Sequence, residues 1–341
     1  MELFEGYFKI YGYPIAPIDR TGIIRFPVRT KSLFPIPNQT VTKKTYSEIC
    51  LERAKELLKR ADETGLRICV CWSGGIDSTA VLCAFFQVAP LAELKDKLVV
   101  MLTHASVKEY RDFYFKHIGG KLVLWNAVNL RNVLGSGNII VNGEHNDQLF
   151  GSDIMLSAIN KFGEESLHAP YDRKMFMQGL GYLKDAQFYV DLFERLAAGA
   201  PIELKTNFDR LWWINFAVKW QTVFMRPLSF SSRPLTKEWV SRCFAPFYGT
   251  EEFQRWSMCN LDRRMKSGWK SYKWPAKDFI YEFTKDAEYR DNKIKELSWK
   301  VLVNDFDAEP RFMSNFIDED FRPHTRITQA ELYEPSNDFI R

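Results

Sequence analysis

The sequence predicts an α/β protein, in which a five-stranded parallel sheet carries helices on both faces and is followed by a mostly helical C-terminal half. Short apolar runs alternate with helical patterns between residues 67 and 155, which is typical of a parallel sheet covered by helices. A pair of adjacent glycines separates the first apolar run from a helical pattern. After about Ser152 the strand patterns fade, so we expect helices there.

The first 45 residues favour a β-hairpin over a helix. The segments 11–18 and 23–28 are apolar and aromatic, and residues 19–22 between them form a turn sequence. Five prolines in this region oppose a helix. A helix should then begin after Thr45, because Thr45 and Glu48 have the spacing of a capping box, and end near Gly65.

Four strands of the sheet can be assigned from the apolar pattern, together with the helices between them. Strands are expected at Arg67–Trp72, Lys97–Thr103, Lys121–Trp125 and Asn138–Asn142. Helices are expected at Asp77–Gln87, at Val107–Ile118 and from about Asp147 onward.

Composition and charge exclude several classes of protein. With 341 residues, of which 46% are hydrophobic and 26% charged, the chain can form one large domain or two ordinary ones. The net charge of +4 is spread along the chain, so nucleic acid is a possible but not a favoured partner. Six cysteines without a Cys-x-x-Cys pair, a start without signal-peptide character and the lack of a membrane-length apolar run predict a reduced, cytoplasmic protein without a membrane partner.

The most informative stretch is Ser-Gly-Gly-Ile-Asp-Ser at residues 73–78. Adjacent glycines let the backbone approach an anion closely, and the N–H groups of the turn and of the helix start can point at phosphate oxygens. A carboxylate at Asp77 can hold Mg²⁺ against those phosphates. The Walker P-loop differs, because there a lysine follows the glycines. We therefore predict a pyrophosphate-binding loop made by Ser73, Gly74, Gly75, Asp77 and Ser78.

A second motif follows the predicted strand at 138–142. The strand ends at Gly143, and the carboxylates of Glu144 and Asp147 then open a helix. Since parallel strands end at one edge of a sheet, Asp147 is expected beside the loop, where it could share Mg²⁺ with Asp77. Two carboxylates at a helix start more often serve capping, but the preceding loop and the Leu-Phe-Gly at 149–151 favour the metal site.

Together the two motifs resemble the synthetase domain of the asparagine synthetase family, within the PP-loop ATP pyrophosphatases. That family carries Ser-Gly-Gly-x-Asp-Ser followed by Gly-Glu-x-x-Asp-Glu-Leu-Phe-Gly-Gly, and this chain departs from it at Gln148 and Ser152. The resemblance implies a PP-loop (HUP-like) fold, ATP and Mg²⁺ as cofactors, and Glu144 as the residue that positions or deprotonates an attacking amine.

Downstream, the resemblance is weaker. Pro246–Phe253 matches a family helix start loosely, and Lys277–Glu282 matches a family Lys-x-x-Leu-Arg helix loosely. The segment 293–298 resembles the one that supplies the family's catalytic lysine. Lys295 is the preferred match and Lys293 its rival, and either lysine could instead lie on a solvated helix face.

We expect four parts: an N-terminal β-hairpin or extension (1–45), which the resemblance does not cover, a nucleotide-binding core (46–155), a helical part of the synthetase domain (156–309) and an irregular tail (310–341). The family's N-terminal glutaminase domain has no counterpart in this sequence, so we expect ammonia to reach the site free or from a partner protein, or an amine to be the nucleophile.

The sequence thus favours an AMP-forming ATP-dependent ligase that adenylates a small-molecule or peptide carboxylate and transfers it to ammonia or an amine. One alternative is a PP-loop enzyme that modifies a nucleobase, in tRNA or DNA, by adenylation. The cysteines have neither the sulfur-transfer nor the zinc spacing common in such enzymes. Another alternative is a nucleotide-binding protein without catalytic activity.

Overall fold

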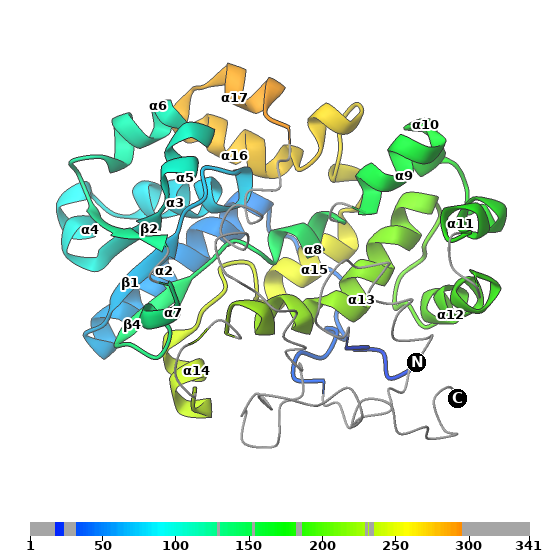
Figure 1. The fold of residues 1–341 in the computed structure, drawn as a ribbon, viewed down its shortest axis with the longest axis horizontal. Helices are drawn as coiled ribbons and strands as arrows, with labels where there is room; N and C mark the ends of the chain where they lie inside the picture. Colours follow the sequence, from blue (N-terminus) through cyan, green and yellow to red (C-terminus); the bar gives the residue numbers. More distant parts are fainter. Residues whose placement is uncertain are drawn as a thin grey trace. The chain divides into compact units, whose positions relative to one another are not determined.

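The chain divides into two compact units in the computed structural model (Figure 1). Unit 1 comprises Met1–Thr40, Asp147–Ser229 and Pro310–Arg341, and unit 2 comprises Val41–Asn146 and Phe230–Glu309. The structure describes residues 18–23, 32–127, 130–151, 154–181, 186–228, 231 and 235–294. Within these ranges no helix combines the length and the apolar character needed to cross a membrane. The four-part division predicted from the motifs stays a prediction.

Unit 2 contains a parallel sheet with the strand order β3-β2-β1-β4. Figure 1 labels β1, β2 and β4. The strands are β1 (Arg67–Cys71), β2 (Leu98–Leu102), β3 (Val123–Asn126) and β4 (Asn138–Val141). The apolar runs of β1, β2 and β4 are buried in the core, as parallel strands covered on both faces require. The predictions of an α/β class, of a parallel sheet and of these four strands are therefore confirmed.

The prediction of five strands is wrong, because the sheet in the described ranges has four. The segment that follows α14 (Lys237–Cys243) runs along the free edge of β4 and occupies the place of a fifth strand. Its Ala245 N–H donates to the carbonyl of Ile140 at 2.9 Å, and its Phe247 N–H donates to that of Asn142 at 2.9 Å. Pro246 between them has no N–H, which restricts such a segment to an edge position.

Helix α2 (Tyr46–Thr64) confirms the predicted capping box. The Thr45 side chain accepts from the Glu48 N–H, and the Glu48 carboxylate accepts from the Thr45 N–H, a pairing that contributes about 1 kcal/mol. The helix ends at Gly65, whose φ of 66° is left-handed. Helices α2 and α3 (Ile76–Val88) pack on each other and on β1, and α16 (Trp274–Thr284) packs on α3.

The single helix expected at 107–118 is three short ones. They are α5 (His104–Glu109), α6 (Arg111–Phe113) and the π-helix η1 (Tyr114–Ile118). The break falls at Tyr110, whose φ of −142° and ψ of 74° are not helical. The Tyr110 ring stacks on Tyr289 at 3.9 Å between centroids, and its hydroxyl donates to Asp286 at 2.9 Å. These tertiary contacts override the helical pattern of the sequence.

The remaining helices of unit 2 surround this core. They are α4 (Leu91–Lys97), α7 (Leu130–Val133), α15 (Glu251–Cys259), α17 (Ala287–Asn292) and the 3₁₀ turns η3 (Leu261–Arg263) and η4 (Trp269–Ser271).

In the part of unit 1 that follows Ser152, the described residues are mostly helical, as expected. Its helices are α9 (Ile154–Phe162), α10 (Glu165–His168), α11 (Arg173–Gly179), α12 (Ala186–Ala198) and α13 (Asn207–Leu228), and the unit boundary falls within α8 (Asn146–Phe150). Helix α13 is buried along almost its whole length. The predicted hairpin strands at 11–18 and 23–28 lie, apart from Ile18 and Ile23, outside the described residues.

Candidate functional site

The predicted phosphate loop joins β1 to α3. Gly74 has a φ of 82°, and a β-carbon there would overlap the carbonyl oxygen of Ser106 and lie 2.9 Å from the Glu109 β-carbon. Only glycine fits both the backbone conformation and the space. The Tyr289 hydroxyl donates to the Gly74 carbonyl at 3.2 Å.

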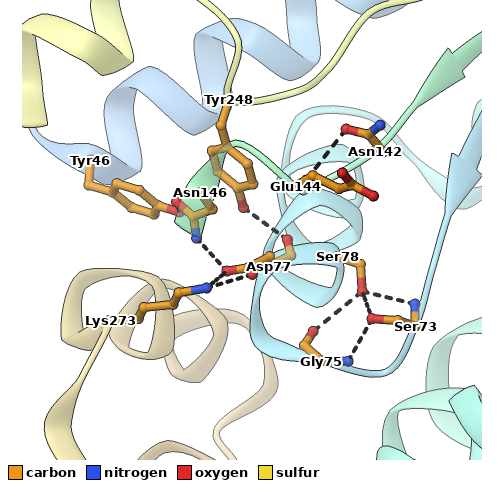
Figure 2. Close-up of polar contacts among 10 residues, drawn as sticks. All are labelled: Tyr46, Ser73, Gly75, Asp77, Ser78, Asn142, Glu144, Asn146, Tyr248 and Lys273. Carbon is orange, nitrogen blue, oxygen red and sulfur yellow. Dashed lines mark hydrogen bonds and ion pairs between the residues drawn. The ribbon is translucent and has the colours of Figure 1, made fainter. Parts of the chain in front are cut away.

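The two serines of the loop bond to each other and to the loop backbone (Figure 2). The Ser73 N–H donates to Ser78 Oγ at 3.0 Å, the two hydroxyls lie 3.0 Å apart, and the Gly75 N–H donates to Ser73 Oγ at 3.2 Å. Gly75 is the N-cap of α3, and no side chain caps that helix. The first-turn N–H groups of a helix have no intrahelical partner, so the start of α3 suits an anion.

The second predicted motif contacts this loop within unit 2. A β-carbon on Gly143 would lie 3.0 Å from the carbonyl carbon of Asp77 and 3.1 Å from the Ser78 nitrogen. The end of β4 therefore lies against the first turn of α3, and a larger residue at 143 would separate them. Glycine here serves a close approach of two backbones.

Asp77 is the centre of a buried polar network (Figure 2). The Lys273 ammonium donates to both carboxylate oxygens at 2.6 Å, and Asn146 Nδ2 donates to Oδ1 at 2.7 Å. Tyr46 donates its hydroxyl proton to Asn146 Oδ1 at 3.0 Å, which fixes the amide orientation. The Tyr248 hydroxyl donates to the Asp77 carbonyl at 2.9 Å.

The two tyrosines stay neutral donors in this network. Burial is the main cause that raises the pKa of Tyr46 and of Tyr248 well above the usual value, and the charge of Asp77 adds to it. Their rings stack at 6.1 Å between centroids with an angle of 19°. Tyr248 therefore holds the Asp77 backbone by a hydrogen bond, and Tyr46 holds the Asn146 amide that contacts the Asp77 carboxylate.

Glu144 follows Gly143 and is buried, with 8% of its surface exposed. Its N–H donates to Asn142 Oδ1 at 3.4 Å, at the end of β4 (Figure 2). The Glu144 charge also contributes, after burial and Cys69, to raising the pKa of the Cys71 thiol well above its usual value. Glu144 thus lies near the carboxyl end of β1 as well as that of β4.

The other predicted site residues are placed less fully. Asp147 is the second residue of α8 and is half-buried, and it belongs to unit 1, whereas Asp77 belongs to unit 2. Their predicted shared Mg²⁺ stays a prediction. Lys295 lies outside the described residues.

Lys293, the rival of Lys295, lies beside the loop. Its ammonium is 3.2 Å from a carboxylate oxygen of Glu109, and these side chains are 9% and 8% exposed. Glu109 is the residue whose β-carbon would crowd a side chain at position 74. The ion pair therefore links the chain after α17 to the segment that covers the glycine turn.

Three lysines gather near the loop, and sequence reasoning missed this grouping. Burial is the main cause that lowers the pKa of Lys277; the charge of Asp291 raises it, and the charges of Lys273 and Lys293 lower it, so Lys277 lies near both of these lysines. Lys273 and Lys277 are each 1% exposed. A signal for them existed: they are spaced i, i+4 around Trp274-Pro275, and proline in the first turn marks a helix start.

Lys277 should make folding stability depend on pH. Burial is the main cause that lowers its pKa to about 8, and its ammonium donates to the Lys270 carbonyl. The unfolded chain keeps this proton up to about pH 10.5, so it binds more protons than the folded chain between about pH 8 and 10.5, and stability rises with pH across that window. Between about pH 8 and pH 10.5, we expect the free energy of unfolding of the wild type, measured with urea, to rise by on the order of 1–2 kcal/mol relative to that of Lys277→Met.

The exposed Lys95, replaced in the same way, controls for the loss of one positive charge. A constant difference between wild type and Lys277→Met over this pH window would contradict the buried-lysine interpretation.

Asp77 offers Mg²⁺ a carboxylate, a ligand that this ion takes together with phosphate oxygens. Among the described side chains no group of three or more His, Cys, Asp or Glu residues forms a ready-made metal site. The Lys273 ammonium lies between the two Asp77 oxygens, where a bridging cation would otherwise lie. Asp77 therefore fits as a single ligand to a metal that phosphates also hold.

Neither a protein-family model nor a curated protein matches the chain.

Proposed function

We propose that this chain is an ATP-dependent, AMP-forming carbon–nitrogen ligase, which adenylates a carboxylate and transfers the acyl group to ammonia or an amine. The contact of Gly143 with the Asp77–Ser78 backbone carries the proposal. It brings the Glu144 motif against the start of α3, so an anion-binding helix start and a buried carboxylate lie at the ends of neighbouring strands.

The loop would hold the pyrophosphate part of ATP. Hydrogen bonds among Ser73, Gly75 and Ser78 fix the turn before any ligand arrives, and this supports the role; an arriving phosphate would replace those that occupy the Ser73 and Gly75 N–H groups. The Lys277 ammonium, which donates to the Lys270 carbonyl, adds positive charge on the same unit. Such prepositioned charge stabilises a leaving pyrophosphate without reorganisation.

Asp77 would hold Mg²⁺ together with the phosphates, and Asp147 is the second ligand that the sequence motif predicts. When bound, Mg²⁺ would neutralise the phosphates and spread the charge of the leaving group.

Glu144 would position or deprotonate the attacking amine. Its burial supports this role, because a carboxylate shielded from water interacts more strongly with an approaching ammonium or amine. Lys295 remains the predicted catalytic lysine from the motif, and Lys293 remains its rival.

The thiols of β1 and α3 do not support the alternative of a PP-loop enzyme that modifies a nucleobase by sulfur transfer. Burial raises the pKa of Cys71 and of Cys83 well above the usual value, so neither is a ready thiolate for sulfur transfer. Nucleic-acid binding that weakens steeply with salt would nevertheless favour that alternative.

ATP–pyrophosphate exchange tests the proposal, with amino acids and short peptides as candidate carboxylates. We expect exchange by the wild type and a loss of about 100-fold or more in Asp77→Ala and in Asp147→Ala, because each removes a predicted Mg²⁺ ligand. Glu144→Gln should retain exchange and lose amide formation, since its role follows adenylation.

Glu52→Gln is the matched control, because Glu52 is a half-exposed carboxylate on α2. Full exchange by Asp77→Ala would remove Asp77 from the metal role. Tight ATP binding by the wild type without exchange on any carboxylate would favour the non-catalytic alternative.

A further inference from the structure

Lys273 is held in place by its backbone. It precedes α16 with a φ of 61° and a ψ of 33°, a left-handed conformation that costs a residue other than glycine about 1 kcal/mol. Its N–H donates to the Arg264 carbonyl at 3.0 Å, and its side chain is 1% exposed. The surrounding structure therefore fixes the direction in which the ammonium points, which is toward Asp77 (Figure 2).

This ammonium already neutralises the carboxylate on which a divalent cation would depend. It lies 2.6 Å from each Asp77 oxygen. A free Mg²⁺ ion that approaches Asp77 meets a neutral ion pair, so little attraction remains. Nucleotide phosphates bring several negative charges and reverse this balance.

We propose that Lys273 is a built-in counter-ion of Asp77, which makes the binding of a divalent cation at the loop conditional on the phosphates of a nucleotide. Lys273 is in this sense a positioning and selecting residue that acts through Asp77. The inference rests on the proposed nucleotide site, and it adds that the metal binds together with the nucleotide and not before it.

The test is calorimetric titration of the protein with Mg²⁺ alone, with ATP alone, and with Mg²⁺ in the presence of the non-hydrolysable α,β-methylene analogue of ATP. The wild type should bind free Mg²⁺ negligibly and bind it in the presence of the analogue. Lys273→Met should bind free Mg²⁺ about tenfold more tightly or better than wild type, because the competing charge is removed. Thermal unfolding should agree, with Mg²⁺ raising the Tm of Lys273→Met and leaving that of the wild type unchanged.

Three variants locate the effect. Lys273→Arg keeps the charge and should behave as wild type toward free Mg²⁺. Lys277→Met removes a lysine of α16 that donates to the Lys270 carbonyl and not to Asp77. Its affinity for free Mg²⁺ should rise much less than that of Lys273→Met. The double variant Asp77→Asn with Lys273→Met should lose the gained Mg²⁺ binding.

The outcomes separate this inference from the proposed function. Free Mg²⁺ binding by the wild type as tight as in the presence of the analogue overturns the inference, and this result needs no variant to fold. Binding of Mg²⁺ with the analogue by the wild type, combined with no gain in Lys273→Met, overturns the inference alone. Failure of the wild type to bind either ATP or the analogue with Mg²⁺ overturns the proposed function itself.

Discussion

Replacement of Gly74 by alanine is expected to lower the free energy of unfolding by about 3 kcal/mol or more and to abolish nucleotide binding. Two costs add at this position. A φ of 82° is unfavourable for alanine, and the new β-carbon would overlap the Ser106 carbonyl and crowd the Glu109 β-carbon. Relief of the overlap requires the segment around α5 to move away from the loop. Urea unfolding and ATP titration measure the two effects.

Gly65→Ala is the matched control. Gly65 has a φ of 66°, but nothing lies within 4 Å of a β-carbon built there. It should therefore lose only the backbone cost of about 1–2 kcal/mol and retain ATP binding. Equal destabilisation by the two substitutions would show that close packing over the loop contributes nothing.

Local features of the fold could be predicted from the sequence because their causes are local. The capping box of α2 needs only Thr45 and Glu48 at the right spacing, and Gly65 ends the helix for a conformational reason. The glycine turn at 73–75 follows from the steric demands of a strand-to-helix connection. The strands β1, β2 and β4 follow from apolar runs that must be buried.

Other features depend on segments that are distant in the chain. The place of the fifth strand is taken by an irregular segment near Pro246, which pairs with β4 from about a hundred residues away, and periodicity cannot show this. The helix expected at 107–118 breaks because Tyr110 stacks on Tyr289. In both places tertiary contacts override a local pattern.

The candidate site likewise contains residues that a local motif indicates and residues that only the packing of distant segments brings there. The residue types of the loop indicate phosphate chemistry, but Lys273 is 196 positions from Asp77 and no motif names it. In the second motif the carboxylates of Glu144 and Asp147 indicated a site near Asp77. The group that bonds to Asp77 is instead the side-chain amide of Asn146. The partners of a buried charge are set by packing, and sequence reasoning about charge alone finds only half of the pair.

The ion pair between Asp77 and Lys273 is expected to have a coupling free energy of about 2–4 kcal/mol in a double-mutant cycle of Asp77→Asn and Lys273→Met. Its physical reason is burial: the Lys273 side chain is 1% exposed and that of Asp77 24%, so a single substitution leaves a desolvated charge without this partner. The double variant should recover much of the stability that either single variant loses. Urea unfolding of the four proteins gives the coupling.

The exposed pair Lys44–Glu52 is the control, because it has the same nitrogen–oxygen distance but lies in solvent. Its nitrogen and oxygen also lie 2.6 Å apart, but its side chains are 44% and 54% exposed, so its coupling should stay below about 1 kcal/mol. The nearest nitrogen–oxygen distance is thus matched, whereas the exposure of the two pairs to solvent differs and Lys273 contacts both carboxylate oxygens. If both cycles gave the same small coupling, Asp77 and Lys273 would be no more than a solvent-screened contact, and the counter-ion role inferred for Lys273 would lose its basis. A large coupling at the buried pair alone would mean that the loop folds with its carboxylate already neutralised.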